Sequence, residues 1–192
     1  MAAVPRIRDN SLLDALDKLE PVAFHGKAWR AVQDGRDVLM GSSAGGRWDD
    51  GTFDVLYTSQ LADGAIAEMH FHLSRGQPVF PSRVRFRLHE LRISLRRALH
   101  LVDVAAIARL GVDTTRWGLL SYVDRHQEYP RTQEVAEAAL FIGYDGLIVP
   151  NARWACSNVI LFSDRIGPDD AEVAQDHGLV DWDAWLAKPF GH

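Results

Sequence analysis

Three separated side chains in the first half of the sequence have the types and spacing for one kind of chemistry. Arg47 follows two glycines in the segment Gly45-Gly46-Arg47-Trp48, then comes Tyr57, and then Glu68. A guanidinium is a planar fork that suits phosphate, an aromatic ring stacks on a heterocycle, and a carboxylate stabilises a nearby positive charge. The set therefore has the groups to hold a dinucleotide pyrophosphate, stack its nicotinamide ring and stabilise a cationic ribose.

The element that must position Glu68 is a helix expected over 59–73. Its apolar residues form one stripe on a helical wheel, made of Leu61, Ala65, Met69 and Leu73. Glu68 lies inside this apolar sector, and His72 shares the same face one turn later. Burying an unpaired carboxylate is costly. Glu68 is therefore expected either to pair with a buried arginine or with His72, or to line a pocket.

The element that must position Arg47 is a glycine-rich loop over 41–52. Gly45 and Gly46 allow positive φ and the close approach of a ligand. Arg30, on a strand expected over 28–32, would supply a second guanidinium. The alternative is a hairpin loop in which Arg47 pairs with a nearby aspartate. No Gly-x-Gly-x-x-Gly or Walker A pattern is present, so a bound nucleotide would be held by another device.

Turn and periodicity signals divide the chain into short helices and short strands. Helices are expected over 12–20 with Ser11 as the cap, 59–73, 103–109, 132–142, after Pro168, and around Trp182 and Trp185. Strands are expected over 28–32, 54–58, 84–95, 147–149 and 159–162. The apolar alternation in 84–95 slips by one residue between Leu88 and Leu91, which indicates two strand segments joined by a bulge or bend. The pattern predicts an α+β fold with a small, bent, mainly antiparallel β core and surrounding helices.

Composition narrows the function classes. The length of 192 residues favours a single domain over 1–192. The net charge is −5, but residues 1–100 carry +2 and residues 101–192 carry −7. This asymmetry argues against direct nucleic-acid binding through a protein-wide positive field, and leaves room for a basic patch that meets an anionic ligand. No apolar run reaches the roughly 18 residues of a membrane span. The single cysteine, Cys156, suits the cytoplasm.

A metal site is not expected from the histidines. His70 and His72 lie about 200° apart on a helix and cannot share a metal there. No His-Glu-x-x-His pattern exists. The chemistry suggested by Glu68 therefore needs no metal.

The blocks around these residues together resemble the RES family of NAD-consuming toxins, over roughly residues 25–165. The blocks are Trp29-Arg30, Gly45 to Gly51, Leu56 to Ser59 with Ala67-Glu68, Gly143 to Leu147, Val149 to Arg153, and Ser157 to Phe162. The family commonly has serine after its Val-Pro pair, whereas this chain has Asn151. Ser157 is close by but occupies a different place in the pattern.

The resemblance implies an ADP-ribosyltransferase-like fold and an enzyme that cleaves the nicotinamide–ribose bond of NAD. Glu68 would stabilise the cationic ribose, and Tyr57 would stack on nicotinamide. Arg47 and Arg30 would clamp the pyrophosphate or orient Glu68. Asn151 or Ser157 would fix the ribose or the carboxamide. The acceptor of ADP-ribose stays open among water, phosphate and a protein side chain.

The resemblance also implies a biological role and a partner. The chain would be the cytoplasmic toxin of a toxin–antitoxin module. The cognate antitoxin would be a small helical protein with a DNA-binding part, and it would block the pocket. Two other readings of the residues stay open. One is a non-catalytic protein that docks a partner through an arginine face on 83–97 and through Trp182 and Trp185. The other is a hydrolase with Glu68 and His72 as an acid–base pair.

Overall fold

The computed structural model describes residues 8–74, 85–119 and 124–188. The strands are β1 (Val22–Gln33), β2 (Val55–Ser59), β3 (Phe86–His100), β4 (Gly146–Pro150), β5 (Ser157–Phe162) and β6 (Ala171–Leu179). The helices are α1 (Asn10–Asp17), α2 (Ala62–Ser74), α3 (Val104–Ala108), α4 (Arg125–Ile142) and α5 (Trp182–Leu186), with a 3-10 turn at Ser163–Arg165. The predicted α+β class with a mainly antiparallel sheet is confirmed.

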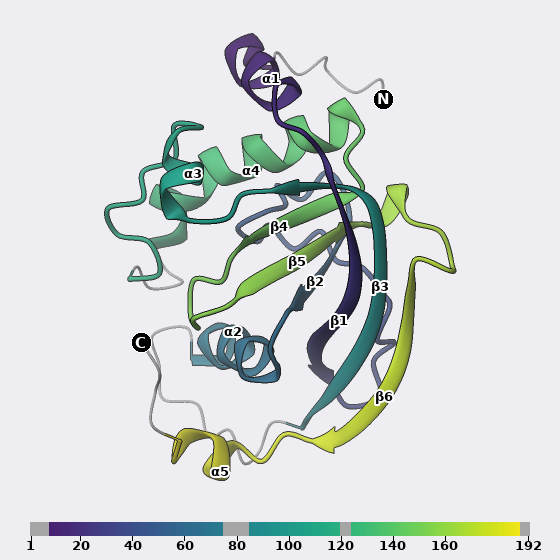
Figure 1. Ribbon diagram of the computed structural model, residues 1–192. Coiled ribbons are helices and arrows are strands. Elements are labelled where there is room, and N and C mark those ends of the chain that lie inside the picture. Colours follow the sequence, from purple (N-terminus) through teal and green to yellow (C-terminus); the bar gives the residue numbers. More distant parts are fainter. Residues whose placement is uncertain (1–7, 75–84, 120–123, 189–192) are drawn as a thin grey trace, which may run out of the picture.

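The strands pair in the order β1-β2-β5-β4-β3-β6, and β1 pairs with β3 as well. The strands β1, β2, β5, β4 and β3 therefore form a closed ring, and β6 pairs with β3 outside this ring. Only β3 and β4 run parallel; the other pairs are antiparallel. The long strands β1 and β3 curve together on one side, whereas α2 and α4 lie near opposite ends of the shorter strands (Figure 1).

The short strands β2, β4 and β5 are buried on both faces, which explains their nearly continuous apolar sequences. One set of their side chains packs inside the ring and includes Leu56, Ile148 and Leu161. The alternate set packs against α1, α3 and α4 and includes Leu147 and Phe162. Successive side chains of a strand point to opposite faces. The three short strands thus connect the ring interior to the helical layer.

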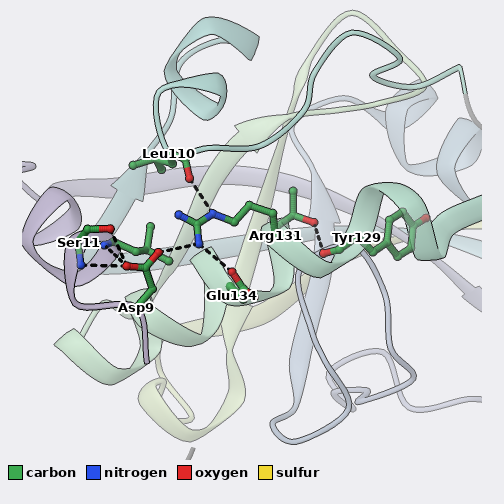
Figure 2. Close-up of polar contacts among 8 residues, drawn as sticks. Asp9, Ser11, Leu110, Tyr129, Arg131 and Glu134 are labelled. Atoms are coloured by element: carbon green, nitrogen blue, oxygen red, sulfur yellow. Dashed lines mark hydrogen bonds and ion pairs between the residues drawn. The ribbon is translucent and has the colours of Figure 1, made fainter. Parts of the chain in front are cut away.

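Helix α4 is tied to α1 by a charged cluster centred on Arg131 (Figure 2). Nη1 of Arg131 lies 3.0 Å from Asp9 and 2.8 Å from Glu134, and its Nε donates to the Leu110 carbonyl at 2.9 Å. Asp9 also caps α1, because its carboxylate accepts from the backbone N–H of Ser11 at 2.9 Å. The cluster fixes α4 relative to α1 and to the end of α3.

Several predicted element bounds were wrong, each for a local physical reason. Asp9, not Ser11, caps the first helix. Helix α4 begins at Arg125 instead of 132, with Pro130 accommodated inside it. The helix predicted after Pro168 is instead a turn followed by β6. In that turn, Asp170 Oδ2 accepts from the Gly167 backbone at 2.7 Å, and the free edge of β3 then pairs with the next residues.

The predicted C-terminal helix is confirmed, whereas the two strand segments predicted within 84–95 were wrong. β3 is one continuous strand, its pairing with β1 is regular from Phe86 to Leu95, and the extra residues at its register shifts with β6 lie in β6. The apolar alternation changes phase because Phe86 and Leu88 pack with the tryptophans of α5, whereas Leu91, Ile93 and Leu95 pack inside the ring.

Three arginines of the arginine face predicted on 83–97 form ion pairs within the chain: Arg85 and Arg87 with Asp34, and Arg92 with Glu172. Trp182 and Trp185 of α5 are buried against α2. Among the described helices, none is long and apolar enough to cross a membrane.

Candidate active site

A cavity of about 600 Å³ opens where β1, β2 and β5 meet α2 and the loop before β2. This volume is typical of a small-molecule site. Its wall includes four of the predicted site residues, namely Arg30, Arg47, Tyr57 and Glu68. Side chains from distant parts of the sequence therefore meet in one hollow.

Glu68 faces this cavity from α2. The cavity-lining residues of the helix are Ala65, Glu68, Met69, His72 and Leu73, which share one face. The inward direction predicted for Glu68 and His72 is confirmed, whereas Leu61 precedes the helix and is 47% exposed. Glu68 Oε1 accepts a hydrogen bond from Asn158 Nδ2 at 3.3 Å. The carboxylate is thus partly exposed to the cavity and is held by a neutral donor.

The loop before β2 is closed by Asp49 and Tyr57. Asp49 accepts from the backbone N–H of Gly45 at 2.7 Å and of Gly46 at 2.8 Å. The Tyr57 hydroxyl donates to Asp49 Oδ2 at 2.9 Å and accepts from the Trp48 N–H at 2.9 Å. Gly45 has φ of +74°, and a Cβ on Gly46 would lie 2.6 Å from the Tyr57 hydroxyl. The second glycine therefore makes room for Tyr57.

Burial of Tyr57 and the adjacent charge of Asp49 raise the pKa of this phenol well above its ordinary value. The hydroxyl therefore stays protonated at neutral pH and remains a hydrogen-bond donor to Asp49. Its ring still lines the cavity. Tyr57 thus offers an aromatic wall while its polar end holds the loop.

The Arg47 guanidinium is enclosed between the loop and α4. It forms a buried ion pair with Glu128, close enough for a short hydrogen bond. Its Cζ atom lies 4.4 Å from the Trp117 ring centroid and 4.9 Å from that of Tyr129. Thr132 donates to the Arg47 carbonyl at 2.6 Å. Arg47 pairs with a distant glutamate of α4, not with a nearby aspartate as the hairpin alternative supposed.

Arg30 differs from Arg47 because it has no acidic hydrogen-bond partner among the residues that the structure describes. Its Nη2 donates to the Met40 carbonyl at 2.9 Å, while the buried Nη1 has no hydrogen-bond partner within 8–74, 85–119 and 124–188. The residue is 8% exposed. Burial, reinforced by the charge of Arg36, lowers its pKa to about 10, so the guanidinium stays charged at neutral pH. A buried cationic donor in a cavity wall is suited to an anion.

The other two predicted site residues lie outside the cavity wall. Asn151 is buried, and its Nδ2 donates to Asn158 Oδ1 at 2.8 Å. Ser157 begins β5, and its carbonyl accepts from the Gln60 N–H at 2.9 Å. Asn158 and Tyr129 also line the cavity but were not predicted from the sequence. Asn158 follows Ser157 in an extended segment, so the alternation of strand side chains was the available signal; for Tyr129 we find none.

The fold and the site define a class of small α+β protein with an anion-suited cavity at the end of a closed strand ring. The RES domain model matches residues 25–183, and the chain belongs to the RES-domain family. A chain from the crystal structure of the M. tuberculosis MbcT-MbcA toxin-antitoxin complex is similar, with a TM-score of 0.77 and 19% identity. The match covers 93% of this chain and 96% of that chain, and it shows a shared fold. No curated protein matches the sequence.

Proposed function

We propose that this protein is the toxin of a toxin–antitoxin module and that it cleaves the nicotinamide–ribose bond of NAD. Membership of the RES-domain family supports an NAD-consuming activity. The observation that carries the proposal is the placement of Glu68 and Arg30 in the wall of one cavity of about 600 Å³. A carboxylate and a buried guanidinium match the cationic and anionic parts of a dinucleotide.

The bond to be broken joins C1′ of the ribose to the ring nitrogen of nicotinamide. Both electrons of this bond leave with the nitrogen, so nicotinamide departs as a neutral molecule. Positive charge develops on the ribose, as in glycoside cleavage. The Glu68 carboxylate stabilises that charge from a site partly shielded from water. The acceptor then donates a lone pair to C1′ and, if it is water, releases a proton.

Arg30 is the stronger candidate for the pyrophosphate contact. Its Nη1 is buried without a hydrogen-bond partner among the described residues, whereas Arg47 is engaged by Glu128. An oxygen of the pyrophosphate would satisfy that donor. Arg47 would then act by holding the cavity wall together. The Tyr57 and Tyr129 rings supply aromatic surface for nicotinamide.

The acceptor and the partner belong to the same proposal. Glu68 and Arg30 govern the departure of nicotinamide and leave water, phosphate and a protein side chain open as acceptors. The likeness to a chain of a toxin–antitoxin complex supports a cognate antitoxin as partner. We propose that this antitoxin covers the cavity. Such a module acts in the cytoplasm, where NAD is present.

The test is incubation with NAD, followed by chromatographic separation of nicotinamide and the ADP-ribose product. Phosphate and cell lysate are added in separate reactions to supply the other acceptors. Wild-type protein should release nicotinamide, and Glu68→Gln should lower the rate by roughly 100-fold or more. Glu20→Gln removes an exposed carboxylate that precedes β1 and should match wild type. Absence of nicotinamide release under all conditions would reject the proposal.

A second candidate function is hydrolysis by an acid–base pair of Glu68 and His72, because both side chains line the cavity. This function predicts a bell-shaped pH profile and loss of activity in His72→Ala. The NAD proposal predicts only a mild effect of that change. Comparing His72→Ala with Glu68→Gln in the nicotinamide assay separates the two.

A further inference from the structure

Two neutral side chains, Asn151 behind the cavity wall and Asn158 in it, form a hydrogen-bonded chain that ends on Glu68. Asn158 Nδ2 donates to Glu68 Oε1 at 3.3 Å. Asn158 Oδ1 accepts from Asn151 Nδ2 at 2.8 Å. Asn151 Oδ1 accepts in turn from the backbone N–H groups of Arg153 at 2.7 Å and Trp154 at 3.0 Å. The links thus lead from the backbone between β4 and β5 to the carboxylate.

The direction of every hydrogen bond in this chain is set by its first link. A backbone N–H can only donate, so the Asn151 side chain must turn its oxygen toward Arg153 and Trp154. Its NH₂ group then faces Asn158, whose oxygen must accept. The NH₂ group of Asn158 is left to face Glu68. The network therefore presents a donor to the carboxylate.

Burial makes this order hard to reverse. Asn151 is 7% exposed and Asn158 is 8% exposed, so bulk water does not replace a lost partner. A flipped amide would place two oxygens or two NH₂ groups face to face, and unsatisfied buried groups are costly. Asn151 Nδ2 also lies 3.4 Å from the Gly64 carbonyl, on the helix that carries Glu68. The network thereby couples the β4–β5 loop to α2.

We propose that Asn158 and Asn151 are positioning residues that hold Glu68 in the cavity as an oriented hydrogen-bond acceptor. The assignment rests on the proposed function for its catalytic meaning, since it gives Glu68 the geometry and charge that bond cleavage requires. Asn151 acts only through Asn158. Its location behind the wall explains why a residue of the Val-Pro block contributes without lining the cavity.

Other charged and titratable groups also act on Glu68. Arg153 and Cys156 of the β4–β5 loop interact electrostatically with Glu68, and so does Tyr129 of α4. Arg47 and His72 line the same cavity. Exchanging an asparagine for aspartate changes none of these groups. Aspartate also adds its own negative charge, so an uncharged exchange is needed to separate loss of the amide donor from added charge.

The test uses Asn158→Asp and Asn151→Asp, which keep the shape of the side chain. Aspartate at 158 places a carboxylate against Glu68. Aspartate at 151 still accepts from the backbone but no longer donates, so Asn158 should flip and turn its oxygen toward Glu68. Both variants should lower kcat about 10-fold or more and move the acidic limb of the pH–rate profile upward by about one unit.

Two control variants are made, one at Asn10, the third asparagine of the sequence, and one that is uncharged at position 158. Asn10→Asp adds the same charge at an exposed position of α1 and should match wild type. Asn158→Leu keeps the side-chain volume and adds no charge but removes the donor, so its acidic limb should also move upward. A shift in the aspartate variants with none in folded Asn158→Leu would assign the effect to added charge and overturn the proposal. Unchanged pH profiles in both folded aspartate variants would overturn the proposal.

A second readout separates this proposal from the proposed function. The titration midpoint of the Glu68 carboxyl carbon is followed by ¹³C NMR, with Glu68→Gln identifying the signal. The midpoint should rise in both aspartate variants, whether or not NAD is cleaved. A rise without nicotinamide release rejects the enzymatic function and keeps the network. Nicotinamide release with an unmoved midpoint in both variants rejects the network.

Discussion

Two of the arginines that line the cavity, Arg30 and Arg47, differ in how many partners the fold gives them. Arg47 is ion-paired with Glu128, stacked between aromatic rings and bonded through its carbonyl to Thr132. Arg30 is equally buried, yet its Nη1 has no hydrogen-bond partner in the described part of the chain. The fold satisfies the first residue internally and leaves a donor of the second to be satisfied by something else. The difference separates a residue that builds the wall from one that is suited to binding.

Replacement of Arg47 by methionine should have the largest effect on stability. It leaves the buried Glu128 carboxylate without its ion-pair partner, which typically costs about 3–5 kcal/mol of folding free energy. The double variant Arg47→Met, Glu128→Leu should recover much of this loss because neither charge remains buried. Urea unfolding measures both. Equal stability of the single and double variants would show that the ion pair is not what fixes this wall.

Replacement of Arg30 by methionine should instead weaken binding while leaving the fold intact. It removes a desolvated charge that has no acidic hydrogen-bond partner within 8–74, 85–119 and 124–188, so the free energy of unfolding should not fall. Loss of a charged hydrogen bond to phosphate should weaken ADP-ribose binding by about 1.5–3 kcal/mol. Calorimetric titration provides the affinity. Tight binding by this variant would remove Arg30 from the site.

The lowered pKa of Arg30 adds a pH dependence to the same comparison. Because its folded pKa is lowered by burial to about 10, the guanidinium begins to lose its charge as pH rises through about 10. Affinity for ADP-ribose should therefore fall across that range in the wild type and change less in Arg30→Met. The same shift means that charged Arg30 opposes folding at neutral pH, and this penalty lessens as pH rises above about 10. An identical pH dependence in both proteins would argue against a charged contact.

Substitution of Gly46 by alanine should destabilise the loop by about 1–3 kcal/mol through overpacking. The added Cβ would lie 2.6 Å from the Tyr57 hydroxyl and 2.7 Å from Asp49 Oδ2. Combining Gly46→Ala with Tyr57→Phe removes the first of these two clashing oxygens, so the two changes should be less harmful together than their separate effects predict. Thermal unfolding of the four proteins tests this. Strict additivity would exclude the contact.

The smallest effect is expected at Arg131, which does not line the cavity. Arg131→Ala breaks partly exposed ion pairs to Asp9 and Glu134, which are typically worth up to about 1 kcal/mol each. Thermal unfolding should shift slightly, and the KM for NAD should not change. A large rise in KM would mean that the anchoring of α4 controls the cavity.

The sequence predicted much of the site because periodicity reveals which way a side chain points. The place of Glu68 within an apolar stripe was enough to predict its inward direction. The partner of Arg47 was not predictable, since Glu128 lies 81 residues away and only the packing of α4 brings it near. The strand β6 was missed because its pairing with β3 is a tertiary effect that outweighs the local helix signal at Pro168.

The most direct test of the central claim is a crystal structure of Glu68→Gln with NAD bound. We expect the nicotinamide ribose to lie beside residue 68 and the pyrophosphate to accept a hydrogen bond from Nη1 of Arg30, while the Arg47–Glu128 ion pair stays intact. NAD bound outside this cavity, or pyrophosphate held by Arg47 after separation from Glu128, would contradict it.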